Sequence, residues 1–147
     1  MKTNYFVSTV CYDIMQENGT LKAVKEKYLI GAMNFTEAEA RTIEELTPYI
    51  NGEISISNIV KTRIHELFTT VAILADKFYK VKIAITTIDE KTGAEKLTTS
   101  TMLVQAENFH NANARFLSTM EKTMMNNEII SITESGIKEY FPYKQKE

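Results

Sequence analysis

The sequence predicts an α+β fold made by tandem duplication, in which one β-β-α-β unit occurs twice within a single domain, 1–147. The observations are a recurring eight-residue motif, strand-like alternation before each copy, and helical periodicity within it. The repeats span residues 4–68 and 78–141, and residues 69–77 join them. Because neither repeat is long enough to bury a comfortable core alone, we expect them to share one across a pseudo-two-fold axis.

The duplication is clearest in the motif itself, which begins at Asn34 and again at Asn108 and reads NFTEAEAR and NFHNANAR. Five of the eight positions are identical, at an offset of 74 residues (108 − 34). Nearer the ends of the repeats, 5–6 matches 78–79 and 64–68 matches 137–141, at an offset of 73 (78 − 5). A match of this extent centred on one motif identifies an internal repeat.

Strands are expected before each copy of the motif. Apolar residues alternate with other residues from Thr9 to Ile14 and again from Lys80 to Ile85, which is typical of half-buried strands. Each strand runs into a turn that contains a glycine, Gly19 in one repeat and Gly93 in the other. Since short hairpin turns join antiparallel strands, we expect an antiparallel sheet of about six strands with two main helices on one face.

The helices are expected to begin inside the motif. Thr36 is the predicted N-cap, forming a capping box with Glu39, and His110 replaces it in the second repeat. An apolar stripe at helical spacing predicts the buried faces, which comprise Ala40, Ile43, Leu46 (or Thr47) and Ile50, then Ala114, Leu117, Met120 and Met124. One or two helical turns are also expected at residues 71–75, which join the repeats.

The composition of the chain restricts the cellular compartments and the classes of function that are compatible with it. The net charge of −2 gives no general attraction to nucleic acid, and no apolar run reaches the length of a membrane span. The beginning of the sequence shows no signal peptide, and a lone cysteine, Cys11, fits a reducing compartment. The sequence therefore predicts a cytoplasmic protein without membrane association.

Catalytic and metal-binding motifs are missing from the sequence. No His-x-x-His or Cys-x-x-Cys spacing, phosphate loop or nucleophile elbow occurs, and Cys11 lies in mid-strand without an evident base. The prediction is therefore a non-enzymatic protein without a metal or cofactor.

Two arginines, Arg41 and Arg115, occupy matching positions early in the two helices. The simpler interpretation is an ion pair, for example between Arg41 and Glu37 or Glu45. The functional alternative is that both guanidinium groups face one anionic ligand.

Lysines on the strands are the main candidates for binding. Lys25 and Lys27 share a strand face, as do Lys80 and Lys82, and neighbouring strands would join them into one basic face. Aromatic residues stand nearby in sequence, among them Tyr12 and Tyr79. A basic sheet with exposed aromatics is one way to bind single-stranded nucleic acid. The guessed site comprises these six residues with Arg41 and Arg115.

The function favoured is a non-enzymatic protein that binds single-stranded DNA or RNA in phage or bacterial DNA metabolism. The alternatives are a protein-interaction or structural module, and a binder of a small nucleotide where the two repeats meet. The oligomeric state stays open.

The repeated motif, together with segments 89–96 and 102–106 and the ending 139–143, resembles an uncharacterised domain-of-unknown-function family found in gut Bacteroidales and their crAss-like phages. The resemblance covers nearly the whole chain. It implies a bacterial or phage cytoplasmic context and brings no activity and no site residues. In the second repeat His110-Asn111-Ala112-Asn113 departs from the acidic helix start of the first, which argues against a symmetric acidic function of the two helices.

Overall fold

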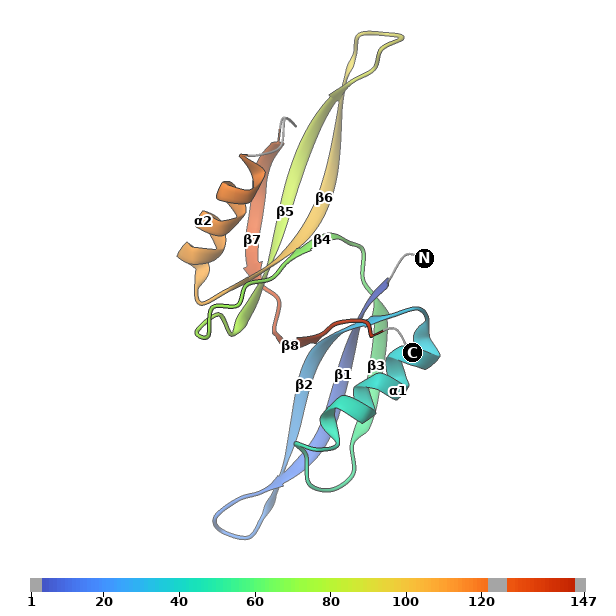
Figure 1. Ribbon diagram of the computed structural model, residues 1–147, viewed down its shortest axis with the longest axis vertical. Coiled ribbons are helices and arrows are strands. Elements are labelled where there is room, and N and C mark those ends of the chain that lie inside the picture. The colour runs from blue at the N-terminus through green and yellow to red at the C-terminus, as the bar shows by residue number, and fades with distance from the viewer. Residues whose placement is uncertain (1–3, 122–126, 145–147) are drawn as a thin grey trace. The chain divides into compact units, whose positions relative to one another are not determined.

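The computed structural model of the protein describes residues 4–121 and 127–144 (Figure 1). Its elements confirm the α+β class and the two main helices. In chain order they are β1 (Asn4–Met15), β2 (Leu21–Ala32), α1 (Phe35–Leu46), β3 (Ser55–Lys61), β4 (Ile64–Phe68), β5 (Lys77–Ile88), β6 (Glu95–Ala106), α2 (Phe109–Met120), β7 (Asn127–Glu134) and β8 (Ile137–Phe141).

The strands divide between two sheets, so the prediction of one antiparallel sheet was wrong. One sheet has the order β3-β1-β2-β8 and the other β4-β6-β5-β7. They belong to two compact units: unit 1 contains the residues up to Thr62 and those from Gly136 onward, and unit 2 is Arg63–Ser135. In each unit one helix covers one face of the sheet (Figure 1).

The two repeats exchange their last strands. β4, which ends the first repeat, pairs in parallel with β6 of unit 2, and β8, which ends the second, pairs in parallel with β2 of unit 1. Each repeat is thus β-β-α-β-β, one strand longer than predicted. Both extra strands are five residues long and carry a register shift, so their side chains do not alternate as a regular strand does.

The helices begin at the first residue of the shared motif. The side chain of Asn34 accepts a hydrogen bond from the backbone N–H of Glu37 at 2.9 Å, and that of Asn108 accepts one from Asn111 at 2.8 Å. The predicted N-caps, Thr36 and His110, were therefore wrong by two positions. Each asparagine side chain satisfies one of the N–H groups of the first helical turn that would otherwise be unpaired, which explains why both motifs begin with it.

The buried helix faces also differ from the predicted stripe. In α1 the buried residues are Ala38, Arg41, Thr42 and Leu46. In α2 they are Ala112, Phe116 and Met120. Of the predicted residues only Leu46 and Met120 are buried; Ile43 and Leu117 are 41% and 46% exposed, and Met124 lies outside the described residues. In α1 the prediction failed because an arginine and a threonine occupy the core face of the helix, and a purely apolar pattern does not detect them.

Each exchanged strand brings one phenylalanine to the core of its unit. In unit 1, Phe141 on β8 stacks on Tyr28, with ring centroids 5.7 Å apart. In unit 2, Phe68 on β4 meets Phe116 edge-on at 6.2 Å. The two phenylalanines are equivalent in the repeats, at an offset of 73 (141 − 68). The core of each unit therefore depends on residues from both repeats.

At one matching position the two cores differ in chemistry. Unit 2 packs Phe116 of α2 on the sheet, whereas unit 1 has Thr42 there, hydrogen-bonded to Ser8 of β1 at 2.8 Å. The Thr42 hydroxyl also donates to the carbonyl of Ala38 at 2.7 Å, so it accepts the proton of Ser8. Both hydroxyls are fully buried and satisfied.

The hairpin turns follow the prediction and the inter-repeat segment does not. Gly19 and Gly93 have φ of 84° and 72°, which the turns require. Residues 69–76 form no helix: the segment makes a single turn at residues 73–74, with the N–H of Ala75 donating to the carbonyl of Ala72 at 3.1 Å.

Candidate functional site

The lysine pairs lie where the strand alternation placed them. Lys25 and Lys27 are exposed on the face of β2 that points away from α1, and Lys80 and Lys82 are exposed on the corresponding face of β5. Hydroxyl-bearing Thr9 lies opposite Lys27 on its sheet. None of the four lysines makes an ion pair within the described residues. The two pairs belong to different units.

The tyrosines assigned to this site lie on the other face of each sheet. Tyr79 is 5% exposed in the core of unit 2, and the hydroxyl of Tyr12 is bonded to Glu26 on the helix side of unit 1. On the lysine side of unit 1 the aromatic pair is instead Tyr5 and Tyr140, with ring centroids 6.1 Å apart. The alternation of β1 could have identified Tyr5, because Tyr5 lies an even number of residues from Thr9 and therefore on the same face of the strand.

The two arginines make structural contacts, each within its own unit. Arg41 donates to the carbonyls of Gly31 at 2.9 Å and Pro142 at 2.6 Å, and pairs with Glu45 at 3.1 Å. Arg115 donates to the carbonyl of Gln105 at 3.0 Å and pairs with Glu107 at 2.6 Å. Gly31 and Gln105 are equivalent in the two repeats, so each arginine joins its helix to the end of the preceding strand.

A polar cluster centred on Glu26 of β2 occurs in unit 1. Its carboxylate, with the side chain 11% exposed, accepts hydrogen bonds from Tyr12 of β1 and from Tyr28, the latter at 3.1 Å, and forms an ion pair with Lys138 of β8. In the second repeat Ser100 and Met102 replace Glu26 and Tyr28. The cluster is therefore specific to unit 1, where it joins the exchanged strand β8 to β2.

The cluster is poorly suited to proton transfer near neutral pH. Burial acts to raise the pKa of Glu26, but hydrogen bonds from Lys138 and Tyr12 and the charge of Lys138 outweigh it and lower that pKa. The hydrogen bond to Glu26 raises the pKa of Tyr12 to about 12, with burial and the charge of Glu26 adding to it. An acid or base works best when its pKa lies near the working pH, and both groups move away from it.

Replacing Glu26 by glutamine is expected to flatten the pH dependence of stability. The lowered pKa of Glu26 stabilises the fold above its ordinary value of 4.5, and this is lost as the pH falls through the folded-state pKa. The raised pKa of Tyr12 stabilises the fold below its ordinary value of 10.0, and this is lost as the pH rises toward about 12. Urea unfolding of both proteins from pH 3 to 11 measures the difference. Parallel profiles would contradict the assignment.

An open groove of about 630 Å³ runs along the hairpin of unit 1. Its lining is Tyr12, Asp13, Ile14, Met15 and Leu21 from the hairpin, with Tyr49, Ile50, Asn51 and Gly52 from the segment after α1. Several of these apolar side chains are exposed: Met15 by 74%, Leu21 by 64% and Tyr49 by 82%. Figure 1 shows the hairpins of both units extending past the helix and edge strands of their own unit.

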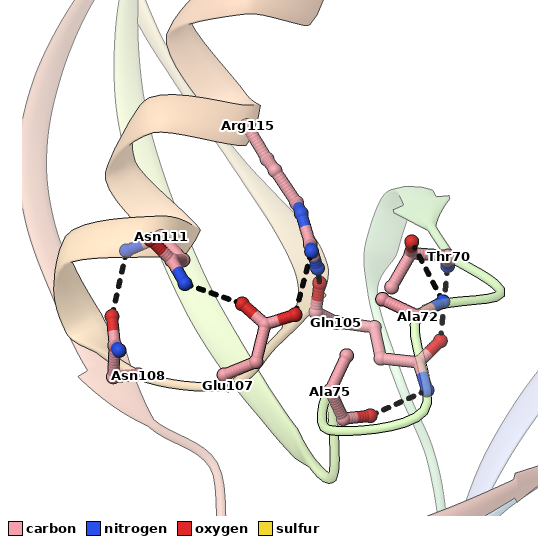
Figure 2. A network of polar contacts seen from close by, with 8 residues as sticks. All are labelled: Thr70, Ala72, Ala75, Gln105, Glu107, Asn108, Asn111 and Arg115. Atoms are coloured by element: carbon pink, nitrogen blue, oxygen red, sulfur yellow. Dashed lines mark hydrogen bonds and ion pairs between the residues drawn. The ribbon is translucent and has the colours of Figure 1, made fainter.

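A loop in unit 2 presents three further apolar side chains. Val71, Ile73 and Leu74 are 100%, 97% and 78% exposed. The amide of Gln105 holds this loop from both ends, accepting from the N–H of Thr70 at 3.1 Å and donating to the carbonyl of Ala75 at 2.9 Å (Figure 2).

The same view shows how that strand end is fixed to α2. Glu107 accepts hydrogen bonds from Asn111 at 2.5 Å and from Arg115 at 2.6 Å (Figure 2). The bond from Asn111, followed by that from Arg115, lowers the pKa of Glu107. In unit 1 the residue equivalent to Gln105 is Gly31, and a Cβ there would lie 2.7 Å from the backbone nitrogen of Tyr143. The held loop is thus specific to unit 2, and sequence reasoning missed Gln105 because only the fold brings it to the loop.

Within residues 4–121 and 127–144, no three His, Cys, Asp or Glu side chains gather in a way that could hold a metal ion. Neither helix in this part of the chain has the length and apolar character needed to cross a membrane.

A family model described as Domain of unknown function (DUF4494) matches residues 4–143. No curated protein and no solved structure matches the chain.

Proposed function

Since the chain belongs to the DUF4494 family, a domain of unknown function, we propose its function from its geometry: it is a non-enzymatic protein that binds another polypeptide. The observation that supports this most directly is the groove beside the hairpin of unit 1, lined by Met15, Leu21 and Tyr49 with most of their surface exposed. Contiguous exposed apolar surface with a polar rim is typical of protein interaction sites.

Two further features support a binding role. The apolar loop at residues 71–74 is held by two hydrogen bonds with the side chain of Gln105, which accepts one and donates the other, so its exposed side chains are displayed at low entropic cost. Glu26 and Tyr12 of unit 1 are bound to one another in a structural cluster, with their pKa values displaced from neutrality. Within the proposal the protein acts in the cytoplasm of a bacterium or during infection by its phage.

A selection from a displayed library of random peptides tests this function. The protein is expected to enrich peptides whose binding is lost in the Met15→Lys variant, because a charge in the groove opposes apolar contact. The matched control is Ile88→Lys on the hairpin of unit 2, where Ile88 is 68% exposed at the equivalent position. Failure to enrich any peptide, or equal loss in both variants, would overturn the proposal.

Single-stranded nucleic acid remains a second candidate ligand, favoured by the exposed lysine pairs and by Tyr5 and Tyr140 on the lysine side of unit 1. If nucleic acid binds, the double variant Lys25→Glu, Lys27→Glu should lower the affinity for a single-stranded oligonucleotide at least tenfold. The double variant Lys91→Glu, Lys96→Glu in the other hairpin should not lower it. Fluorescence anisotropy at low and high salt measures this. Binding that does not weaken with salt would contradict phosphate contacts by lysine.

A further inference from the structure

We propose that the groove of unit 1 takes an extended peptide carrying basic and apolar residues, which adds as a strand to the free edge of β1. The inference rests on the proposed polypeptide-binding function and names the form and chemistry of the ligand.

The first argument is the unpaired backbone of β1. β3 pairs with β1 only as far as Cys11, opposite Ser55, whereas β1 itself continues to Met15. From Tyr12 to Met15, β1 therefore pairs with β2 on one side, and no strand of the described part of the chain pairs with it on the other. An open strand edge presents N–H and C=O groups that readily pair with another chain.

The second argument is that the groove lies at this open edge. Its lining comprises Tyr12–Met15 of β1 and Leu21 of β2 from the hairpin, together with Tyr49–Gly52 from the segment that leads to β3. The space opens because that segment leaves β1 beyond the last paired residue. Four strand residues span about 13 Å, so a peptide of this length fits alongside the free part of β1, with alternate side chains toward Ile14 or Met15.

The third argument is charge. Asp13 lines the groove, Glu53 follows the last lining residue, Gly52, and Glu17 lies at the hairpin turn. None of these carboxylates makes an ion pair within the described residues. Across residues 12–22 and 49–53, Lys22 is the one basic residue against these three carboxylates, so the rim is acidic in net charge and favours a basic ligand.

The probe is a fluorescent octapeptide in which lysine alternates with isoleucine and valine. Three twins accompany it: one with glutamate in place of lysine, and two with N-methyl groups on alternate amides, one for each edge of the strand. The parent peptide should bind, and the glutamate twin should bind at least tenfold more weakly at low salt. One N-methylated twin should lose at least tenfold in affinity and the other should not, because only one edge of an added strand faces β1.

Protein variants separate the parts of the proposal. Asp13→Lys should abolish the preference for the lysine peptide over the glutamate peptide, because it leaves the rim without net charge, whereas Asp89→Lys in the other hairpin should leave that preference unchanged. Equal affinity of the two N-methylated twins would overturn strand addition, and equal affinity of the lysine and glutamate peptides would overturn the basic ligand. In both cases peptides enriched from the library and lost in Met15→Lys would leave the polypeptide-binding function standing.

A second copy of the chain is the competing occupant of this edge, and sedimentation of the whole protein tests it. A monomer in both wild type and Met15→Lys supports a peptide ligand. A wild-type dimer that Met15→Lys converts to a monomer would overturn the peptide in favour of self-association.

Discussion

Replacing Phe116 by alanine is expected to lower the free energy of unfolding by about 3–5 kcal/mol, the usual cost of removing a fully buried phenylalanine. The side chain has no exposed surface and lies in the main apolar cluster of unit 2. It also meets Phe68, which belongs to the other repeat. Urea unfolding followed by circular dichroism measures the loss.

The neighbouring residue provides the control. Leu117 is 46% exposed, so Leu117→Ala should cost less than about 1 kcal/mol. The sequence pattern had assigned Leu117 to the buried face and not Phe116. A larger loss in Leu117→Ala than in Phe116→Ala would restore the sequence-based assignment and contradict the packing described for α2.

Ending the chain at Ser135, which removes β8, is expected to unfold unit 1 while leaving unit 2 folded. The truncation removes Phe141 from the core, the ion pair of Lys138 with Glu26, and the Pro142 carbonyl that Arg41 bonds. Loss of the phenylalanine alone costs about 3–5 kcal/mol, comparable with the whole stability of many small domains. Hydrogen exchange should show fast exchange in β1 and β2 and continued protection in β5 and β6.

A peptide corresponding to residues 136–144, added to the truncated protein, should restore protection in β1 and β2 because it supplies the missing strand. Protection of unit 1 that does not change on truncation would contradict the pairing of β8 with β2.

Much of the fold could be predicted from the sequence because each repeat carries its own local signals. The alternation in β1 and β5 and the glycines of both hairpin turns depend on neighbouring residues alone. The exchange of β4 and β8 could not be predicted, since it depends on pairing between segments far apart in the chain. Helical turns were expected at residues 71–75, where the structure has a single turn, for a related reason. The side chain of Gln105, from β6, bonds the N–H of Thr70 and the carbonyl of Ala75 at the two ends of this loop.

The candidate site was harder to predict than the fold. Strand alternation correctly placed each lysine pair on one exposed face of its strand. The same alternation, applied to β1, places Tyr12 on the face opposite Cys11 and Lys25, because directly paired residues share a face. The groove depends on where β3 stops pairing with β1, and the role of Arg41 depends on the carbonyl of Pro142, which the exchanged strand brings to it. Neither has a local signal in the sequence.

The exchange of strands between the repeats is the central structural claim, and cutting the chain between the repeats tests it most directly. A specific protease site placed at Ile73–Leu74, where both side chains are largely exposed, would separate β1–β4 from β5–β8. Because β4 pairs with β6 and β8 with β2, the two fragments should elute together from a sizing column and separate only in denaturant. Fragments that separate without denaturant, each still folded, would contradict the exchange.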